Sequence, residues 1–302
     1  MERRALFKIA ALSSLAVAIP NGLYPYERTK SNFRFCLNTS TISGQSLGIL
    51  RSIDIVSAAG YDGIELWVRD VKAFIDSGNK PSVLRKYLED SGLKLENAIG
   101  FAPWLDGKEG MAQMKKEMEM MAGVGCSRIA APALGLKDGE TLDLFLLGEK
   151  YRQLIEVGKS IGVKPLLEFW GASKNLFHIG QALMAVAVAN SSDASILADV
   201  YHMFRGNSGF DSLKMLKGDV LELFHMNDYI SDIPREQQKD SDRVYPGDGV
   251  APLKQILTDL KNMGGEKVLS LELFNRNYWQ QDAKMVAKTG LDKMKNLMAE
   301  IS

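Results

Sequence analysis

The chain has 302 residues, of which 46% are hydrophobic and 25% charged, so it can bury one large core. Lys plus Arg and Asp plus Glu number 37 each, and the absence of a long basic block argues against a nucleic-acid-binding protein. Cys36 and Cys126 are too few for a disulfide framework, and we expect them to be buried free thiols.

Residues 1–30 are expected to be an export signal and a short linker, outside the folded domain. Arg3, Arg4 and Lys8 form a basic start, and Ala16-Val17-Ala18 supplies a small-x-small cleavage pattern. The apolar run Ile9–Ile19, which includes this pattern, is shorter than the roughly 20 helical residues that span a bilayer. The alternative interpretation is a buried amphipathic first helix.

The paired arginines followed by Ala5-Leu6-Phe7-Lys8 resemble a twin-arginine export signal, although Glu2 stands where such signals usually carry serine or threonine. The resemblance implies a periplasmic protein that keeps no stable membrane span once the signal is removed.

From Phe33 onward, short apolar runs alternate with longer amphipathic stretches. The predicted strands are Phe33–Leu37, Gly63–Trp67, Leu93–Gly100, Ser127–Pro132, Lys164–Phe169, Ser195–Val200, Leu221–Met226 and Lys267–Leu273. The predicted helices are Leu47–Ala59, Ser82–Ser91, Met111–Gly123, Thr141–Ile161, Leu176–Asn190, Gly209–Lys217, Leu253–Met263 and a last one from about Asp282. Near-continuous apolar strands are typical of a parallel sheet covered on both faces.

Eight βα units at a spacing of about 30 residues predict a single-domain (β/α)₈ barrel, a TIM barrel, over residues 31–302. The runner-up is a doubly wound open sheet. That fold would normally place a glycine-rich phosphate loop after the first strand, and Asn38-Thr39-Ser40 contains none. The polar segment Tyr229–Gly249 is expected to be a functional loop over the catalytic face.

Four ionisable residues, Glu168, Asp199, His225 and Glu272, fall at the ends of the last four predicted strands. The carboxyl ends of barrel strands converge on one mouth, where catalytic groups sit. A buried charge is costly unless it is paired or bound to a cation, so a satisfied salt bridge is the alternative for each residue taken alone. Together, three carboxylates and an imidazole suit one divalent ion such as Mn²⁺, Mg²⁺, Co²⁺ or Zn²⁺.

These strand ends carry a family resemblance. The segments are Glu168, Asp199-x-x-His202, His225-x-Asn227-Asp228, Arg243-x-x-Pro246-Gly247-Asp248-Gly249 and Glu272. They resemble the xylose-isomerase-like barrel superfamily of sugar phosphate isomerases and epimerases, which includes ketose 3-epimerases, inosose dehydratases and endonuclease IV. The resemblance runs from about Phe33 to the end of the chain. Its motifs are specific for the superfamily and weak for the reaction.

The resemblance implies that Glu168, Asp199, His225 and Glu272 bind one divalent ion, usually Mn²⁺. It also implies that Glu168 and Glu272 act as catalytic acid and base, and that His202 and Arg243 contact the substrate. Glu65, at the end of the second strand, matches a position that often faces the substrate; a buried ion pair is the equal alternative.

Several aromatic residues near strand ends could stack on the C–H faces of a sugar, and core packing is the alternative for each. They are Trp67, Phe101, Trp104, Trp170 and Phe204. His178 is expected to be an ordinary helix residue.

Endonuclease IV chemistry is improbable because its three-metal site needs histidines that this chain lacks. Only three histidines are present, and Ser241 and Arg243 stand where the nuclease carries an aspartate and a histidine. The expected function is therefore a metal-dependent sugar isomerase or epimerase, which abstracts a proton next to a carbonyl through a metal-stabilised enediolate. The alternatives are a periplasmic lyase or hydratase on keto-sugars or 3-keto-glycosides, and a carbohydrate-binding barrel without turnover. A homo-oligomer is possible.

The export interpretation predicts where the mature chain begins. N-terminal sequencing of protein recovered from the periplasm should start near Ile19 or later, because the small residues before it are the expected cleavage site. An intact cytoplasmic form that retains Met1 would contradict the interpretation.

Overall fold

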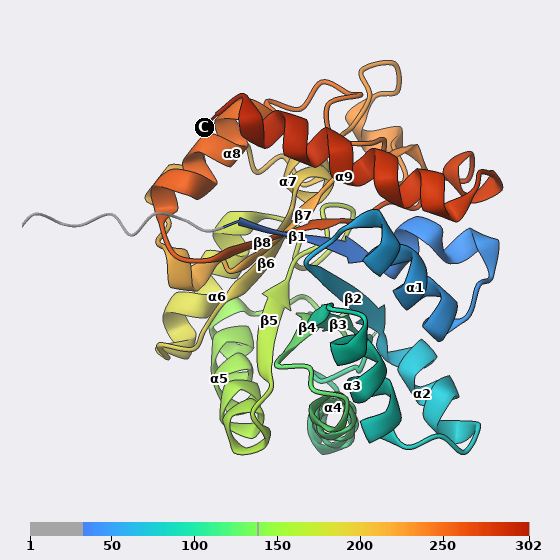
Figure 1. The fold of residues 1–302 in the computed structure, drawn as a ribbon. Helices are drawn as coiled ribbons and strands as arrows, with labels where there is room; N and C mark the ends of the chain where they lie inside the picture. The colour runs from blue at the N-terminus through green and yellow to red at the C-terminus, as the bar shows by residue number, and fades with distance from the viewer. Residues whose placement is uncertain (1–32, 138, 302) are drawn as a thin grey trace, which may run out of the picture.

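The computed structural model describes residues 33–137 and 139–301, so the expected export signal lies outside the described residues. Eight parallel strands close into a barrel in chain order, with the helices outside it, which confirms the predicted single-domain TIM barrel (Figure 1). The strands are β1 (Phe33–Asn38), β2 (Gly63–Trp67), β3 (Lys94–Ile99), β4 (Arg128–Pro132), β5 (Lys164–Glu168), β6 (Ile196–Asp199), β7 (Leu223–Met226) and β8 (Lys267–Leu271).

The helices alternate with the strands along the chain. They are α1 (Ile49–Ala59), α2 (Val68–Asp76), α3 (Pro81–Asp90), α4 (Gly107–Gly123), α5 (Leu144–Ile161), α6 (Ile179–Ala189), α7 (Val200–Arg205), α8 (Leu253–Met263) and α9 (Ala283–Ala299). None of the helices in the described part of the chain combines the length and apolar composition that a bilayer crossing requires.

The predicted helices differ from the structure in two places, after β6 and after β2. The predicted helix Gly209–Lys217 is wrong, because that segment forms short 3-10 turns and α7 instead follows β6 directly. Asp199 caps α7 by accepting a hydrogen bond from the backbone N–H of His202, and Asn207 and Gly209, both with positive φ, stop helical continuation. The second difference is α2, which sequence analysis did not anticipate because it begins at once after β2.

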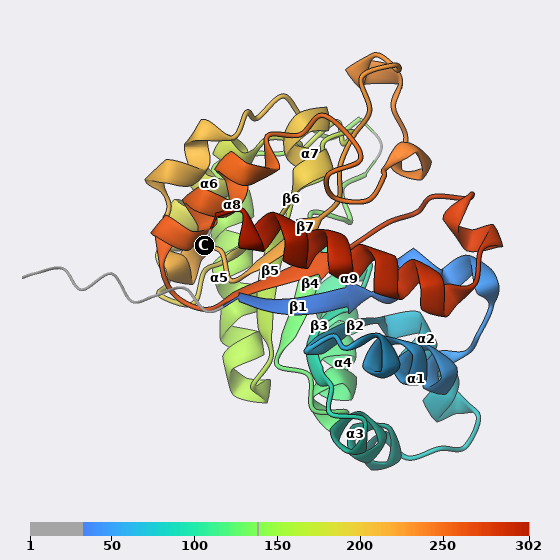
Figure 2. The ribbon, with the colours of Figure 1, turned by 45° about the horizontal axis from the view of Figure 1, so that its top comes forward.

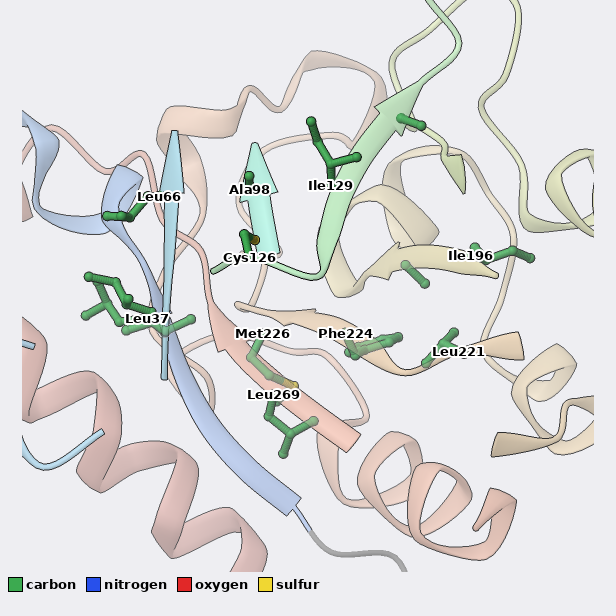
Figure 3. Close-up of a cluster of buried hydrophobic side chains, with 14 of the residues drawn as sticks. Leu37, Leu66, Ala98, Cys126, Ile129, Ile196, Leu221, Phe224, Met226 and Leu269 are labelled. Carbon is green, nitrogen blue, oxygen red and sulfur yellow. The ribbon is translucent and has the colours of Figure 1, made fainter. Parts of the chain in front are cut away.

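Strand register sorts the side chains into two sets. Leu223 pairs with Val268 and His225 pairs with Ser270, so alternate residues of neighbouring strands share a level inside the barrel. Cys36, Leu197 and Leu223 belong to the apolar cluster within the barrel. The intervening residues, such as Leu37, Phe224 and Leu269, belong to the larger core cluster (Figure 3). Both cysteines are buried and free, as expected.

A set of ion pairs stabilises the amino-terminal end of the barrel. The fully buried Glu96 carboxylate lies 2.8 Å from Arg34 and 3.1 Å from Arg128. Arg128 also lies 2.8 Å from Glu222, which pairs with Lys164. Because Glu96 has no solvent exposure, these cations must replace the water that its charge would otherwise bind.

We expect Glu96→Gln to lower the free energy of unfolding by about 2–3 kcal/mol, because it leaves two partly buried guanidinium groups without their shared partner. Glu119→Gln is the matched control. Its exposed pair with Lys115, at 3.8 Å, should be worth less than about 0.5 kcal/mol. Guanidinium chloride unfolding measures both, and equal midpoints for the two variants would contradict the assignment.

Candidate active site

Three of the four predicted metal ligands meet at the carboxyl-terminal mouth of the barrel. Asp199 ends β6, His225 lies in β7, and Glu272 follows β8 by one residue. All three are buried, and each offers a ligand atom within 4.8 Å of the other two. The register explains this convergence, because β7 pairs with β6 and β8 and places His225 opposite both Asp199 and Ser270. Glu168, at the end of β5, lies outside this group.

The imidazole of His225 is held between carboxylates on both sides. Its Nε2 lies 3.0 Å from Oε2 of Glu65, which indicates that Nε2–H donates to that carboxylate. Its Nδ1 lies 3.2 Å from Oε2 of Glu272 and 3.7 Å from Oδ2 of Asp199, yet has no hydrogen-bond partner among the described residues. A buried lone pair that faces two acid oxygens needs a cation, so these residues fit a divalent metal ion.

The same carboxylates also change the pKa of His225. Burial lowers the pKa of His225, but the carboxylates of Glu272 and Glu65 outweigh burial and hold the pKa well above its usual value. A proton and a metal ion therefore compete for Nδ1.

Glu168 lies in a different electrostatic environment from its neighbours. Burial, together with the negative charges of Glu272 and Asp199, raises the pKa of Glu168 to about 8, although the charge of His225 partly opposes this. A carboxyl group with such a pKa can hold or release a proton near neutral pH, which is what a general acid or base requires.

Arg243 supplies a positive charge next to the two acidic ligands. Its Nη1 donates to Oδ2 of Asp199 at 2.9 Å and to Oε2 of Glu272 at 2.7 Å, and its side chain is 1% exposed. Its guanidinium carbon also lies over the rings of Tyr201, at 4.6 Å, and Phe274, at 5.1 Å. These contacts fix the guanidinium group at the rim of the candidate metal site.

The predicted loop Tyr229–Gly249 brings Arg243 to the site and extends beyond the carboxyl ends of the strands (orange in Figure 2). Asp228 anchors it, because its carboxylate accepts hydrogen bonds from the backbone N–H groups of Tyr229, Gly247, Gly249 and Ala251. The loop also contributes Asp240, which pairs with Nη2 of Arg243 and which sequence analysis missed. An exposed acid in a polar loop gives no signal before the loop's path is known.

A pocket of about 530 Å³ opens beside these residues. Its charged and ionisable lining consists of Glu168, His202, Asp240, Arg243 and Glu272. His202, Arg243 and Trp170, predicted to contact the substrate, all line it. The pocket is large enough for a drug-sized organic molecule.

Glu65 and Trp104, predicted to contact the substrate, do not line this pocket. Glu65 is fully buried beneath His225, where it also accepts hydrogen bonds from Ser270 and, at 2.8 Å, from Asn97. It therefore supports the imidazole instead of facing a ligand. Trp104 is fully buried as well. Its indole N–H donates to the carbonyl of Pro132 at 2.6 Å, and its ring packs near Tyr151.

Of the other three aromatic residues proposed to contact a sugar, two line the pocket and one does not. Trp67 and Phe101 line the pocket, whereas Phe204 lies outside its lining and stacks on Tyr229 at 3.7 Å between ring centroids. His178 caps the start of α6, where its Nδ1 accepts a hydrogen bond from the N–H of Gly180 at 2.9 Å.

Sequence analysis gave no role to the side chains that connect the carboxylates, although Asn227 belongs to a motif that carries the family resemblance. Asn38 donates to Oε1 of Glu272 at 3.0 Å, and Asn227 donates to Oδ1 of Asp199 at 3.1 Å. Asn38 ends β1, so the strand-end rule that found the acids could have found it too.

Comparison with known proteins gives the family. The model of the xylose isomerase-like TIM barrel family matches residues 53–297, and the chain belongs to this family. An inosose isomerase from Halalkalibacterium halodurans is 28% identical over 276 residues, which cover 86% of this chain and 94% of the relative. A 3-dehydroshikimate dehydratase from Pseudomonas putida is 24% identical over 254 residues, which cover 79% of this chain and 38% of the relative.

Among solved structures, the crystal structure of IOLI protein with a binding zinc atom superimposes with a TM-score of 0.80 at 24% identity. The match covers 89% of this chain and 99% of that protein, which shows that the two share a fold. The two curated relatives named above are enzymes, one an isomerase and the other a dehydratase.

The support of His225 by Glu65 yields a prediction for metal binding. Glu65→Gln should weaken the affinity of the chelator-stripped protein for Mn²⁺ or Zn²⁺ about tenfold, because a neutral amide polarises the imidazole less than a carboxylate does. Isothermal titration calorimetry measures the dissociation constant.

Glu266→Gln is the matched control, since Glu266 lies beside Arg34 just before β8 begins, at the opposite end of that strand from Glu272. It should leave the dissociation constant unchanged. An unaltered constant in Glu65→Gln would separate Glu65 from the metal centre, and no binding by the unaltered protein would contradict the centre itself.

Proposed function

We propose that the protein is a metal-dependent isomerase or epimerase of a sugar or sugar-like carbonyl compound. The observation that carries the proposal is the unpaired Nδ1 of His225, buried and aimed at the acid oxygens of Asp199 and Glu272. The inosose isomerase relative, which matches over most of both chains, supports the reaction class.

We propose that Asp199, His225 and Glu272 hold the ion, with Glu168 as the fourth ligand from β5, and that the ion is Mn²⁺. Three acids and an imidazole also suit Zn²⁺, and the IOLI structure contains zinc. When bound, the ion would act as a Lewis acid on the substrate's carbonyl and neighbouring hydroxyl.

The protein's own groups would move the proton. Glu168 and Glu272 line the same pocket, so a substrate there can meet one carboxylate on each face. One carboxylate removes a proton from the carbon next to the carbonyl, and the other returns it. Delivery to the opposite face of the same carbon inverts it, whereas delivery to the adjacent carbon exchanges aldose and ketose.

His202 and Arg243 would orient the substrate. Both line the pocket, and Nη2 of Arg243 lies 3.2 Å from Nε2 of His202. A guanidinium charge in this position can stabilise negative charge that develops on nearby substrate oxygens. The anchored loop holds it there before the substrate arrives, so little reorganisation is needed.

Elimination is the second candidate reaction, and the 3-dehydroshikimate dehydratase relative favours it. The same proton abstraction would be followed by loss of a substituent from the next carbon, as in a lyase or hydratase acting on keto-sugars or 3-keto-glycosides. Export to the periplasm and assembly into a homo-oligomer remain proposals alongside either reaction.

An exchange experiment tests the proposal. Metal-loaded protein in deuterated water should introduce deuterium next to the carbonyl of a suitable substrate drawn from inososes, ketoses and 3-keto-glycosides, because the abstracted proton exchanges with solvent. Removal of the metal by a chelator, or Glu272→Gln, should abolish the exchange measured by NMR, and Glu266→Gln should preserve it.

The products separate the candidates. Deuterium incorporation without loss of a substituent supports isomerisation or epimerisation, whereas release of water or an aglycone supports elimination. Full exchange by Glu272→Gln would remove that residue from the mechanism, and exchange without any divalent metal would contradict the proposed role of the ion.

A further inference from the structure

The pocket beside the candidate metal site has two chemically different halves. The charged and ionisable residues lie at the end of β5, in α7, just after β8 and in the loop after β7. The described lining residues from β2, β3 and the loop after β4 are apolar, apart from one glycine: Trp67, Ile99, Phe101, Ala133, Leu134 and Leu136. Because the barrel closes in chain order, β2–β4 lie across the mouth from β6–β8.

A continuous row of aromatic rings runs from Trp67 through Phe101 in the apolar half to Trp170, which follows β5. The ring centroid of Phe101 lies 5.3 Å from that of Trp67 and 5.9 Å from that of Trp170. The indole N–H of Trp67 is already occupied by Oδ1 of Asn38, at 3.0 Å, so its ring offers the pocket only an apolar surface. Phe101 remains 45% exposed although it packs against two other rings, so its side chain is open to a ligand in the pocket.

A substituted sugar fits this arrangement better than a free monosaccharide does. A free sugar carries hydroxyl groups around its ring, and those turned toward Ile99, Leu134 and Leu136 would lose their water without gaining a hydrogen-bond partner. Aromatic rings can cover a sugar's C–H face, but branched aliphatic side chains do not replace hydroxyl hydration. A ligand whose polar groups gather at one end meets both halves.

We infer that the β2–β4 half of the pocket is a subsite for an apolar, aromatic or alkyl substituent of the carbohydrate, so that the substrate is a substituted sugar such as a glycoside. The inference rests on the proposed function for its polar half, in which the carbohydrate lies against Arg243 and Glu272. Phe101 is the specificity-determining residue, because it is the most exposed aromatic group in the subsite.

Equilibrium binding tests the inference without turnover or metal. The probes are matched methyl and phenyl β-glycosides of glucose, galactose and mannose, together with phenol alone. The full chain is titrated with each probe by calorimetry and by tryptophan fluorescence, since Trp67 and Trp170 line the pocket. In at least one pair the phenyl glycoside should bind about tenfold or more tightly than the methyl glycoside, because the ring transfers apolar surface out of water.

Phe101→Ser should bring the ratio of the two dissociation constants close to one. Phe145→Ser is the matched control, because Phe145 is 63% exposed on α5 and lies outside the pocket lining, so its ratio should equal that of the unaltered protein. Phe101 is 45% exposed and Phe145 63% exposed, so neither substitution should prevent folding.

Three results would overturn the inference: equal affinities within every pair, a phenyl preference that survives in Phe101→Ser, or no binding of any phenyl probe at millimolar concentration. Its failure is distinct from that of the proposed function. Deuterium exchange with unsubstituted sugars alone would preserve the reaction and remove the subsite, whereas phenyl selectivity without any exchange would do the reverse.

Discussion

The contact between His225 and the carboxylates around it is the constraint on which the site depends. Glu65 fixes one nitrogen of the ring from inside the barrel, so the other must face Asp199 and Glu272 at the mouth. That direction places a buried lone pair against two acids, an arrangement that a cation stabilises. Glu65 thereby orients the imidazole toward Asp199 and Glu272, although Glu65 does not itself line the pocket.

Around this centre, the fold separates groups that stabilise from groups that react. The amino-terminal end of the barrel holds the ion pairs of Glu96, and an apolar cluster containing Cys36 and Leu223 fills part of the interior. The mouth collects carboxylates whose charges are only partly compensated. Arg243 offsets two of them, whereas burial and the charges of Glu272 and Asp199 raise the pKa of Glu168. Glu168 is therefore suited to take up or release a proton near neutral pH.

The loop after β7 is anchored on Asp228 and contributes two charged residues to the pocket. Asp228 binds four of the backbone N–H groups that follow it, and Gln238 within the loop donates to the carbonyls of Ile230 and Ile233, so both residues set the path of the loop. Arg243 and Asp240 are delivered to one side of the pocket as a result. The opposite side, from β2 to the loop after β4, receives no charge from the described residues that line it, which gives the pocket its polar and apolar halves.

The sequence by itself determined the barrel and the acids at its mouth. Apolar runs at regular spacing define parallel strands, and the carboxyl ends of such strands must converge, so Asp199, His225 and Glu272 could be predicted to meet. Which way a side chain points within that end was decided only by tertiary structure. Glu65 and Trp104 were also expected near strand ends and in contact with the substrate, yet both side chains are fully buried and lie outside the pocket lining. Loop contacts such as those of Arg243 with Asp199 and Glu272 join residues far apart in the chain, and local periodicity does not predict them because the path of a polar loop depends on the groups it binds.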